Sequence, residues 1–234
     1  MTRQTQKTSP GMRLQLGASV LSAARAVDTR LVKARLGRFE RAHHRYVEGQ
    51  RKVDAAESQL RTAQARLGRY DAIQDEALET LACVLAHDGQ PRKRPFEAFG
   101  ASTPAAIAYL PPGESAKAVH QLVETIQRSK TVSKETQQAA QAADKAARDV
   151  EQALGPIVKL QDNVRDARRT RDAVGQGWES SLAALRRGAR SAADEGAPDL
   201  YPTLFPAVVR VTTKTKAPDT PVPDAPPTPT ATAA

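Results

Sequence analysis

Apolar residues recur at alternating spacings of three and four along much of the chain, the pattern of a helix that buries one narrow stripe. No proline occurs between residues 14 and 88. Ten successive stripe positions in this region carry no charged side chain: Phe39, Ala42, Tyr46, Gly49, Val53, Ala56, Leu60, Ala63, Leu67 and Tyr70. Because a heptad pattern sustained over this length is typical of a coiled coil, residues 14–88 are predicted to form a first helical arm.

The stripe continues on both sides of this run, but in a different register upstream. The upstream positions are Val20, Ala24, Val27, Leu31 and Ala34. The five-residue step from Ala34 to Phe39 predicts a phase shift near Gly37. The downstream positions are Ile73, Ala77, Leu81 and Val84. Gly89 and Pro91 then predict the end of the helix.

A second helical arm is predicted over residues 114–194. Its apolar positions are Val119, Leu122, Ile126, Ala140, Ala143, Ala147, Val150, Leu154, Ile157, Leu160, Val164, Ala167, Val174, Trp178, Leu182 and Leu185. Gly155–Pro156 is expected to kink this arm, because proline removes a helix donor and clashes with the preceding turn. The polar run 129–138 is its weakest part, and Arg171 is a strongly polar residue on the later stripe.

The two arms have similar lengths and are separated by a proline-rich connector, residues 89–113. We therefore predict an all-α fold, a long antiparallel coiled-coil hairpin with the connector at its tip. Each arm would extend over about 110–120 Å at 1.5 Å per residue. The alternative is an elongated four-helix bundle with breaks near Gly49 and at Gly155–Pro156. The heptad passes through Gly49 without losing phase, which favours the hairpin.

The two ends of the chain are expected to differ from the arms. Residues 1–13 are predicted to be a flexible N-terminus, although their basic character leaves a targeting segment open. Residues 195–211 are predicted to be a docking segment. Residues 212–234 hold six prolines and seven threonines. This Pro/Thr-rich tail is predicted to be disordered, because it cannot bury enough apolar surface to offset its ordering entropy.

Composition narrows the class of protein. Aromatic residues make up 4% of the chain and charged residues 26%, which favours thin helix-on-helix seams over a thick core. No run reaches the roughly 18 apolar residues that a transmembrane helix needs. The single cysteine excludes an intramolecular disulfide, and a cytoplasmic location is expected. The sequence contains no phosphate-binding loop and no nucleophile elbow, so we expect no catalytic residue and no cofactor.

One possible metal site follows from the hairpin topology. Cys83 and His87 lie one helical turn apart just before the tip, and His120 and Glu124 lie one turn apart just after it. A hairpin would bring the two pairs towards each other, and zinc accepts this set of ligands. A small buried cysteine and exposed histidines near a loop explain the same residues without a metal.

Positive charge suggests a second kind of site. The formal net charge is +9, and eight Lys and Arg lie between Arg30 and Lys52 against Glu40 and Glu48. Such surfaces attract phosphates through counterion release. A solvated helix face explains the same charges, and no aromatic residues interleave with them as base-stacking platforms. The candidate anion or nucleic-acid contacts are Arg38, Arg41, Arg45, Lys52, Arg92, Lys93, Arg94, Arg165, Arg168 and Arg169.

The sequence thus favours a non-enzymatic structural or interaction protein, a scaffold or adaptor that contacts other proteins. The candidate partner contacts are Phe96, Phe99, Tyr109, Leu200, Tyr201, Leu204 and Phe205, which are expected in irregular, exposed segments. A sequence-independent binder of nucleic acid or anionic surfaces is the first alternative, and a helical metal-binding protein is the second. A homo-oligomer also stays open, since a long apolar seam can pair with a second copy of the chain.

Overall fold

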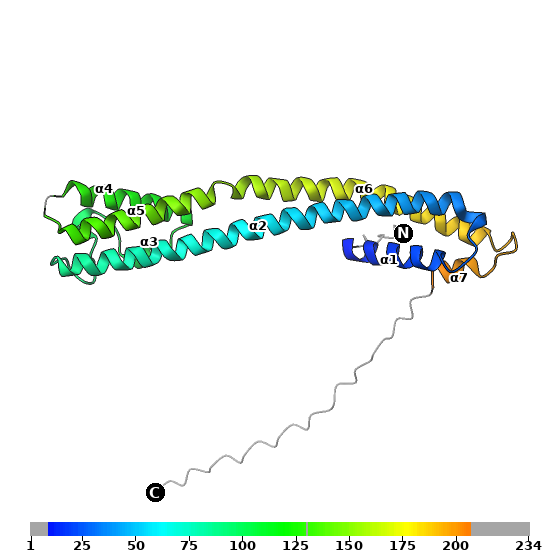
Figure 1. Cartoon of the computed structure of the whole chain (residues 1–234), viewed down its shortest axis with the longest axis horizontal. Helices are drawn as coiled ribbons and strands as arrows, with labels where there is room; N and C mark the ends of the chain where they lie inside the picture. Colours follow the sequence, from blue (N-terminus) through cyan, green and yellow to red (C-terminus); the bar gives the residue numbers. More distant parts are fainter. Residues whose placement is uncertain (1–8, 130, 207–234) are drawn as a thin grey trace, which may run out of the picture.

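The computed structural model describes residues 9–129 and 131–206. All regular elements in this part of the chain are helices: α1 (Pro10–Ala24), η1 (Arg30–Val32), α2 (Lys33–His87), η2 (Glu97–Phe99), α3 (Pro104–Ala108), α4 (Pro112–Arg128), α5 (Lys134–Leu154), α6 (Ile157–Ser191) and α7 (Leu200–Leu204). Helix α2 runs antiparallel to α5 and α6, which follow each other end to end (Figure 1). The predicted all-α hairpin is confirmed.

Helix α2 decides between the hairpin and the four-helix bundle. It has 55 residues and passes through Gly49 without a break, so the bundle alternative is wrong. The break expected at Gly155–Pro156 is present, because α5 ends at Leu154 and α6 begins at Ile157. The opposite helix α2 is continuous there and bridges this break.

The first arm does not run without interruption from residue 14 to residue 88. Helix α1 ends at Ala24, and the chain turns before η1 and α2, so that α1 lies beside α2 and α7 (Figure 1). Asp28 stabilises this turn, because its carboxylate accepts a hydrogen bond from the backbone N–H of Arg30 at 3.0 Å. The change of register near Gly37 therefore did signal a break, but the break lies several residues earlier.

The second arm begins later than predicted. Helix α4 ends at Arg128 and packs against α5 instead of continuing into it. Ser133 caps the N-terminus of α5, accepting a hydrogen bond from the N–H of Thr136. Asp88, at the end of α2, accepts hydrogen bonds from the N–H of Ser133 at 3.0 Å and from Oγ1 of Thr136 at 2.7 Å. These hydrogen bonds connect the C-terminal end of α2 to the N-terminal end of α5.

Two apolar cores lie at opposite ends of the hairpin. The tip lobe is built by α2, α4, α5 and the connector around Leu78, Leu81, Leu85, Phe96, Ile107, Ala116, Val119, Leu122, Val123, Ile126, Ala140, Ala143, Ala147 and Val150. The base lobe is built by α1, α2, α6 and α7 around Val20, Val32, Phe39, Tyr46, Trp178, Leu182, Leu185, Ala189, Ala192, Leu200 and Leu204. Each lobe adds further helices to the two arms.

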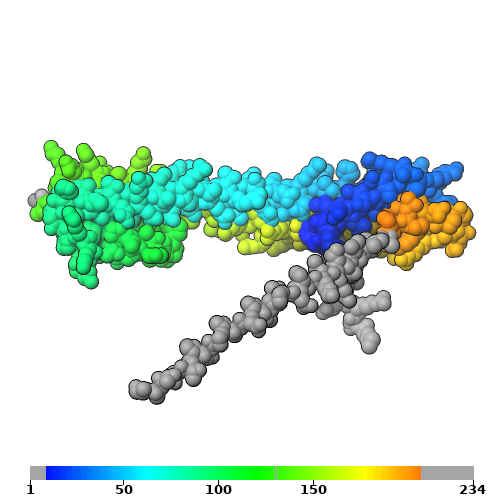
Figure 2. All heavy atoms as spheres, turned by 90° about the horizontal axis from the view of Figure 1, so that it is seen from below, coloured from blue at the N-terminus to red at the C-terminus, as the bar shows by residue number. Residues whose placement is uncertain are grey.

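Between the lobes the arms pack as a bare pair. This waist consists of residues 54–66 of α2 and 156–168 of the opposite arm, and the molecule is visibly thinner there (Figure 2). No residue from 54 to 70, all of them described, is fully buried. On α2 the predicted stripe residues Leu60 and Ala63 are half-buried, whereas Ile157 and Val164 of the opposite arm are buried.

The stripe changes register where α2 enters the tip lobe. Ile73, a predicted stripe residue, is 50% exposed, whereas its neighbour Gln74 is fully buried. The buried face then continues through Leu78, Leu81 and Leu85. Helix α4 is the cause, because Nε2 of Gln74 donates a hydrogen bond to Oγ of Ser115 on that helix at 2.6 Å. A polar pair replaces the apolar contact that the heptad pattern predicts.

Gly49 marks a close approach of the two arms. A Cβ added at Gly49 would lie 3.3 Å from Cα of Arg171 on α6. The Arg171 side chain lies across this contact, donating hydrogen bonds to Oε1 of Gln50 at 3.0 Å and to Oδ1 of Asp172. Arg171, the polar residue on the stripe of the second arm, fits in the seam because Gly49 opposite it has no side chain.

Replacing Gly49 and Gly68 separately by Ala tests this contact. Gly68 lies in the same helix with nothing within 4 Å of an added Cβ, so Gly68→Ala is expected to raise the free energy of unfolding by about 0.5–1 kcal/mol through helix propensity. Gly49→Ala is expected to lower it by about 1 kcal/mol, because the backbones must move apart. Urea unfolding measures both values, and equal shifts would contradict the close approach.

Candidate functional site

The base lobe is organised around the single tryptophan. The Trp178 ring packs against Phe39 and Tyr46 of α2, with ring centroids 5.7 and 6.2 Å apart. Its Nε1–H donates a hydrogen bond to Nδ1 of His43 at 3.2 Å. His43 is only 7% exposed. These contacts fix the rotation of α2 about its own axis relative to α6.

Helix α1 covers one face of this lobe. A Cβ added at Gly17 would lie 2.2 Å from Nδ1 of His43, so α1 approaches the imidazole as only glycine allows. Arg13, from the same helix, pairs with Glu179 of α6 and places its guanidinium carbon 5.6 Å from the centroid of the Tyr46 ring. These contacts place α1 on the flank of the hairpin formed by His43 and Glu179.

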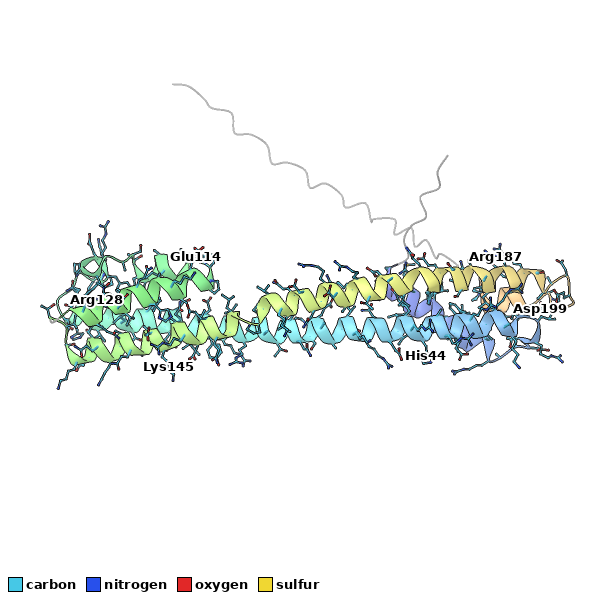
Figure 3. The ribbon with its side chains drawn as sticks, turned by 90° about the horizontal axis from the view of Figure 1, so that it is seen from above. His44, Glu114, Arg128, Lys145, Arg187 and Asp199 are labelled. Atoms are coloured by element: carbon cyan, nitrogen blue, oxygen red, sulfur yellow. The ribbon has the colours of Figure 1, made fainter. Side chains whose placement is uncertain are left out.

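The opposite flank is open and forms a groove of about 340 Å³. Helix α2 contributes three arginines to the groove, and α6 contributes mainly small residues. The lining residues are Arg38, Arg41, Ala42, Arg45, Ala173, Val174, Gly177 and Ser181. In Figure 3, which views the rod from above, α1 lies behind the two arms, whereas the view from below in Figure 2 has α1 and α7 in front. No residue of α1 or α7 lines the groove.

The three arginines of the groove differ from the waist arginines in their pairing. Arg38, Arg41 and Arg45 are exposed, and none of them takes part in an ion pair within the described residues. The waist arginines, by contrast, are paired: Arg165 with Asp162 at 2.8 Å, Arg168 with Glu57 at 2.7 Å and Arg169 with Asp166 at 3.7 Å. The groove arginines therefore present charge that nearby carboxylates leave uncompensated, and Arg92 and Lys93 at the tip likewise take part in no ion pair within the described residues.

The remaining predicted cations lie away from this groove. Lys52 does not line it, although it lies on the same helix. Arg92 and Lys93 line a cleft of about 620 Å³ at the tip, and Arg94 pairs with Glu97 at 3.4 Å. The structure therefore places nine of the ten predicted anion contacts in the base groove, the waist or the tip, and Lys52 on α2 between the groove and the waist.

The predicted metal ligands are not brought together. Cys83 and His87 line the tip cleft. The ring of His120 instead faces α5, with Nδ1 2.7 Å from Asp144 and Nε2 3.5 Å from Glu151. Among residues 9–129 and 131–206, no group of three or more His, Cys, Asp or Glu is arranged to hold a metal ion.

The predicted partner contacts divide into buried and accessible residues. Phe96, Leu200 and Leu204 are at most 4% exposed, so the expectation that they lie in exposed segments is wrong, because the lobes absorb them. Tyr201 and Phe205 are half-buried under Arg190 and Arg186. Phe99 is half-buried, and Tyr109 is 91% exposed.

Sequence reasoning missed one wall of the groove. Ala173, Gly177 and Ser181 follow each other at intervals of four on α6, which places them on one face of the helix. That spacing was visible in the sequence. These small residues form a groove only because arginines of α2 lie opposite them, and the sequence does not show how α2 pairs with α6.

Comparison with known proteins gives no relative: no protein-family model, no curated protein and no solved structure matches the chain. Of the helices described, none combines the length and apolar character that crossing a membrane requires.

Acidification is expected to destabilise the base lobe through His43. Burial, with a smaller contribution from the charge of His44, lowers the pKa of His43 below its ordinary value of 6.5. The unfolded chain then binds the proton more readily, so the free energy of unfolding should be unaffected by His43 above pH 6.5 and fall as the pH drops below it. Trp178 fluorescence can report urea unfolding at a series of pH values.

The matched variant is His43→Gln, which has no imidazole to titrate. Its stability is expected to fall less than that of the unaltered chain between pH 7 and pH 5. Parallel curves for the two proteins would show that His43 is not the responsible group.

Proposed function

We propose that this chain is a non-catalytic scaffold, a helical rod that holds a protein partner at its tip lobe at a fixed distance from its base lobe. The observation that carries the proposal is the unbroken helix α2, which joins the two lobes. From Arg41 in the base groove to His87 at the tip, α2 spans about 70 Å at 1.5 Å per residue. A scaffold needs such a spacer between separate surfaces.

The construction of the rod supports a fixed spacing. The arm opposite α2 is interrupted at Gly155–Pro156, but α2 itself is continuous across that point. Bonds from Asp88 fasten the end of α2 to the start of α5. The tight packing at Gly49 fixes α2 against α6 on the base side of the waist.

The tip presents the most exposed aromatic residue among those described. Tyr109 is 91% exposed and Leu110 38% exposed, next to a groove of about 420 Å³ lined in part by Phe99, Ile107 and Leu110. Thr103 caps α3 through its side chain, accepting a hydrogen bond from the N–H of Ala106. Aromatic side chains on short, capped elements lose little entropy on binding and often dominate interfaces.

We further propose a cytoplasmic setting. The single cysteine, Cys83, is exposed and free. Such a thiol is stable in a reducing compartment.

Site-specific photo-crosslinking in cells tests the scaffold. A photoreactive phenylalanine analogue placed at position 109 is expected to capture one discrete protein, since the side chain there is exposed at the tip. The matched control carries the same analogue at Val158, which is 67% exposed in the waist. The same products from both positions, or none from position 109, would overturn the proposal.

A competition experiment measures how much Tyr109 contributes to binding the partner. Added unlabelled chain should abolish the crosslink from position 109. Tyr109→Ser is expected to compete at least about fivefold less well, because removing a central interface aromatic typically costs more than about 1 kcal/mol. The substitution leaves the fold intact, since the ring makes little contact with the rest of the chain. Equal competition would contradict a role for Tyr109.

A further inference from the structure

The open groove of the base lobe points to a ligand of definite chemistry. Arg38, Arg41 and Arg45 form a row along α2 that extends over about 10 Å at 1.5 Å per residue. Each carries a planar guanidinium, which can bind phosphate oxygens in a bidentate manner. Because nearby carboxylates do not pair with them, a ligand need not displace an existing ion pair.

The α6 residues opposite the arginines leave space for a ligand but offer no charged group to bind it. Nothing lies within 4 Å of a Cβ added at Gly177, and Ala173 also leaves space for a ligand. The hydroxyl hydrogen of Ser181 is already used, since its Oγ donates to the carbonyl oxygen of Gly177 at 2.7 Å. Recognition in the groove therefore falls to the guanidinium groups, which select negative charge.

The charge around the groove favours a polymer over a single small anion. Over residues 33–52, α2 carries seven Lys and Arg against Glu40 and Glu48. The excess of positive charge thus continues along the helix beyond the groove itself. One strand of duplex DNA carries a phosphate for every 3.4 Å of helix axis, so the row of three arginines matches about three successive phosphates.

The residues beside the arginines distinguish among anionic surfaces. Helices that bind a membrane surface insert large apolar side chains beside their cations. The exposed large apolar residues of the described chain are Met12, Leu31, Ile73, Tyr109, Leu110 and Val158, and none of them lines the groove. Proteins that bind single strands stack bases on aromatic rings, and the groove contains no aromatic residue.

We propose that this groove binds the phosphate backbone of duplex nucleic acid without reading its sequence. A duplex keeps its bases stacked inside and presents phosphates alone, which suits a row of arginines without stacking platforms. The inference adds an occupant for the base lobe of the proposed scaffold. Its test does not involve the tip, so the two proposals fail separately.

Fluorescence anisotropy with the full chain and a labelled duplex DNA of arbitrary sequence is the direct test, at about 50 and 200 mM salt. Single-stranded DNA of the same length and vesicles containing anionic lipid are the comparison probes. The duplex is expected to bind most tightly, with an affinity that falls steeply as salt rises. No binding at 50 mM salt, or tighter binding to the vesicles or the single strand, would overturn the proposal.

Two triple variants of equal charge separate the groove from overall charge. Replacing Arg38, Arg41 and Arg45 by Gln is expected to weaken duplex binding at 50 mM salt at least tenfold. It should also reduce the slope of log affinity against log salt by about 2.7, or about 0.9 for each phosphate that an arginine no longer neutralises. The control replaces the paired Arg165, Arg168 and Arg169 by Gln and should leave the slope nearly unchanged. Equal effects in both variants would show that duplex binding depends on the net charge of the chain and would contradict binding at the groove.

A third variant keeps all three arginines. Gly177→Glu places a carboxylate opposite them in open space and replaces a helical glycine by a better helix former. It is expected to weaken duplex binding about tenfold, whereas Gly177→Gln, its uncharged counterpart, should weaken it much less. Unchanged binding by Gly177→Glu, with an unaltered helical circular dichroism spectrum, would show that the phosphates bind elsewhere.

Discussion

The antiparallel pairing of α2 with α5 and α6 is the constraint on which the rest of the structure depends. Two helices cover only part of each other's surface, so the α2 side of their seam stays half-buried in the waist, at Leu60 and Ala63. Full burial requires further helices, and the chain supplies them at both ends. Helices α1 and α7 complete the base lobe, and α4 with the connector completes the tip lobe. The two-lobed rod follows from this division.

Polar side chains within the seam specify how the helices fit together. Gln74 bonds Ser115 in the tip lobe, His43 accepts from Trp178 in the base lobe, and Arg171 crosses beside Gly49. A buried polar group is costly without its partner. Sliding or rotating either arm would separate these pairs, whereas an apolar stripe of alanine and leucine tolerates such shifts. The polar pairs therefore favour one register of the helices.

The arginines of the waist and of the base lobe differ in whether a carboxylate neutralises their charge. The waist arginines Arg165, Arg168 and Arg169 lie beside carboxylates of their own or the opposite arm. The base arginines Arg38, Arg41 and Arg45 face small residues instead. The same residue type is thus compensated in one region and left accessible in another. This local difference, and not the net charge of the chain, supports the base lobe as a phosphate-binding surface.

The sequence by itself determined the helical arms, because heptad spacing and the proline positions act locally; the break at Gly155–Pro156 is an example. Only the tertiary structure decided that α4 folds back on α5, that Gln74 replaces Ile73 on the buried face, and that Phe96 is core. It also placed Arg38, Arg41 and Arg45 along one groove, away from the other candidate cations. Burial and ion pairing depend on the neighbours that each side chain acquires, and those neighbours come from distant parts of the chain.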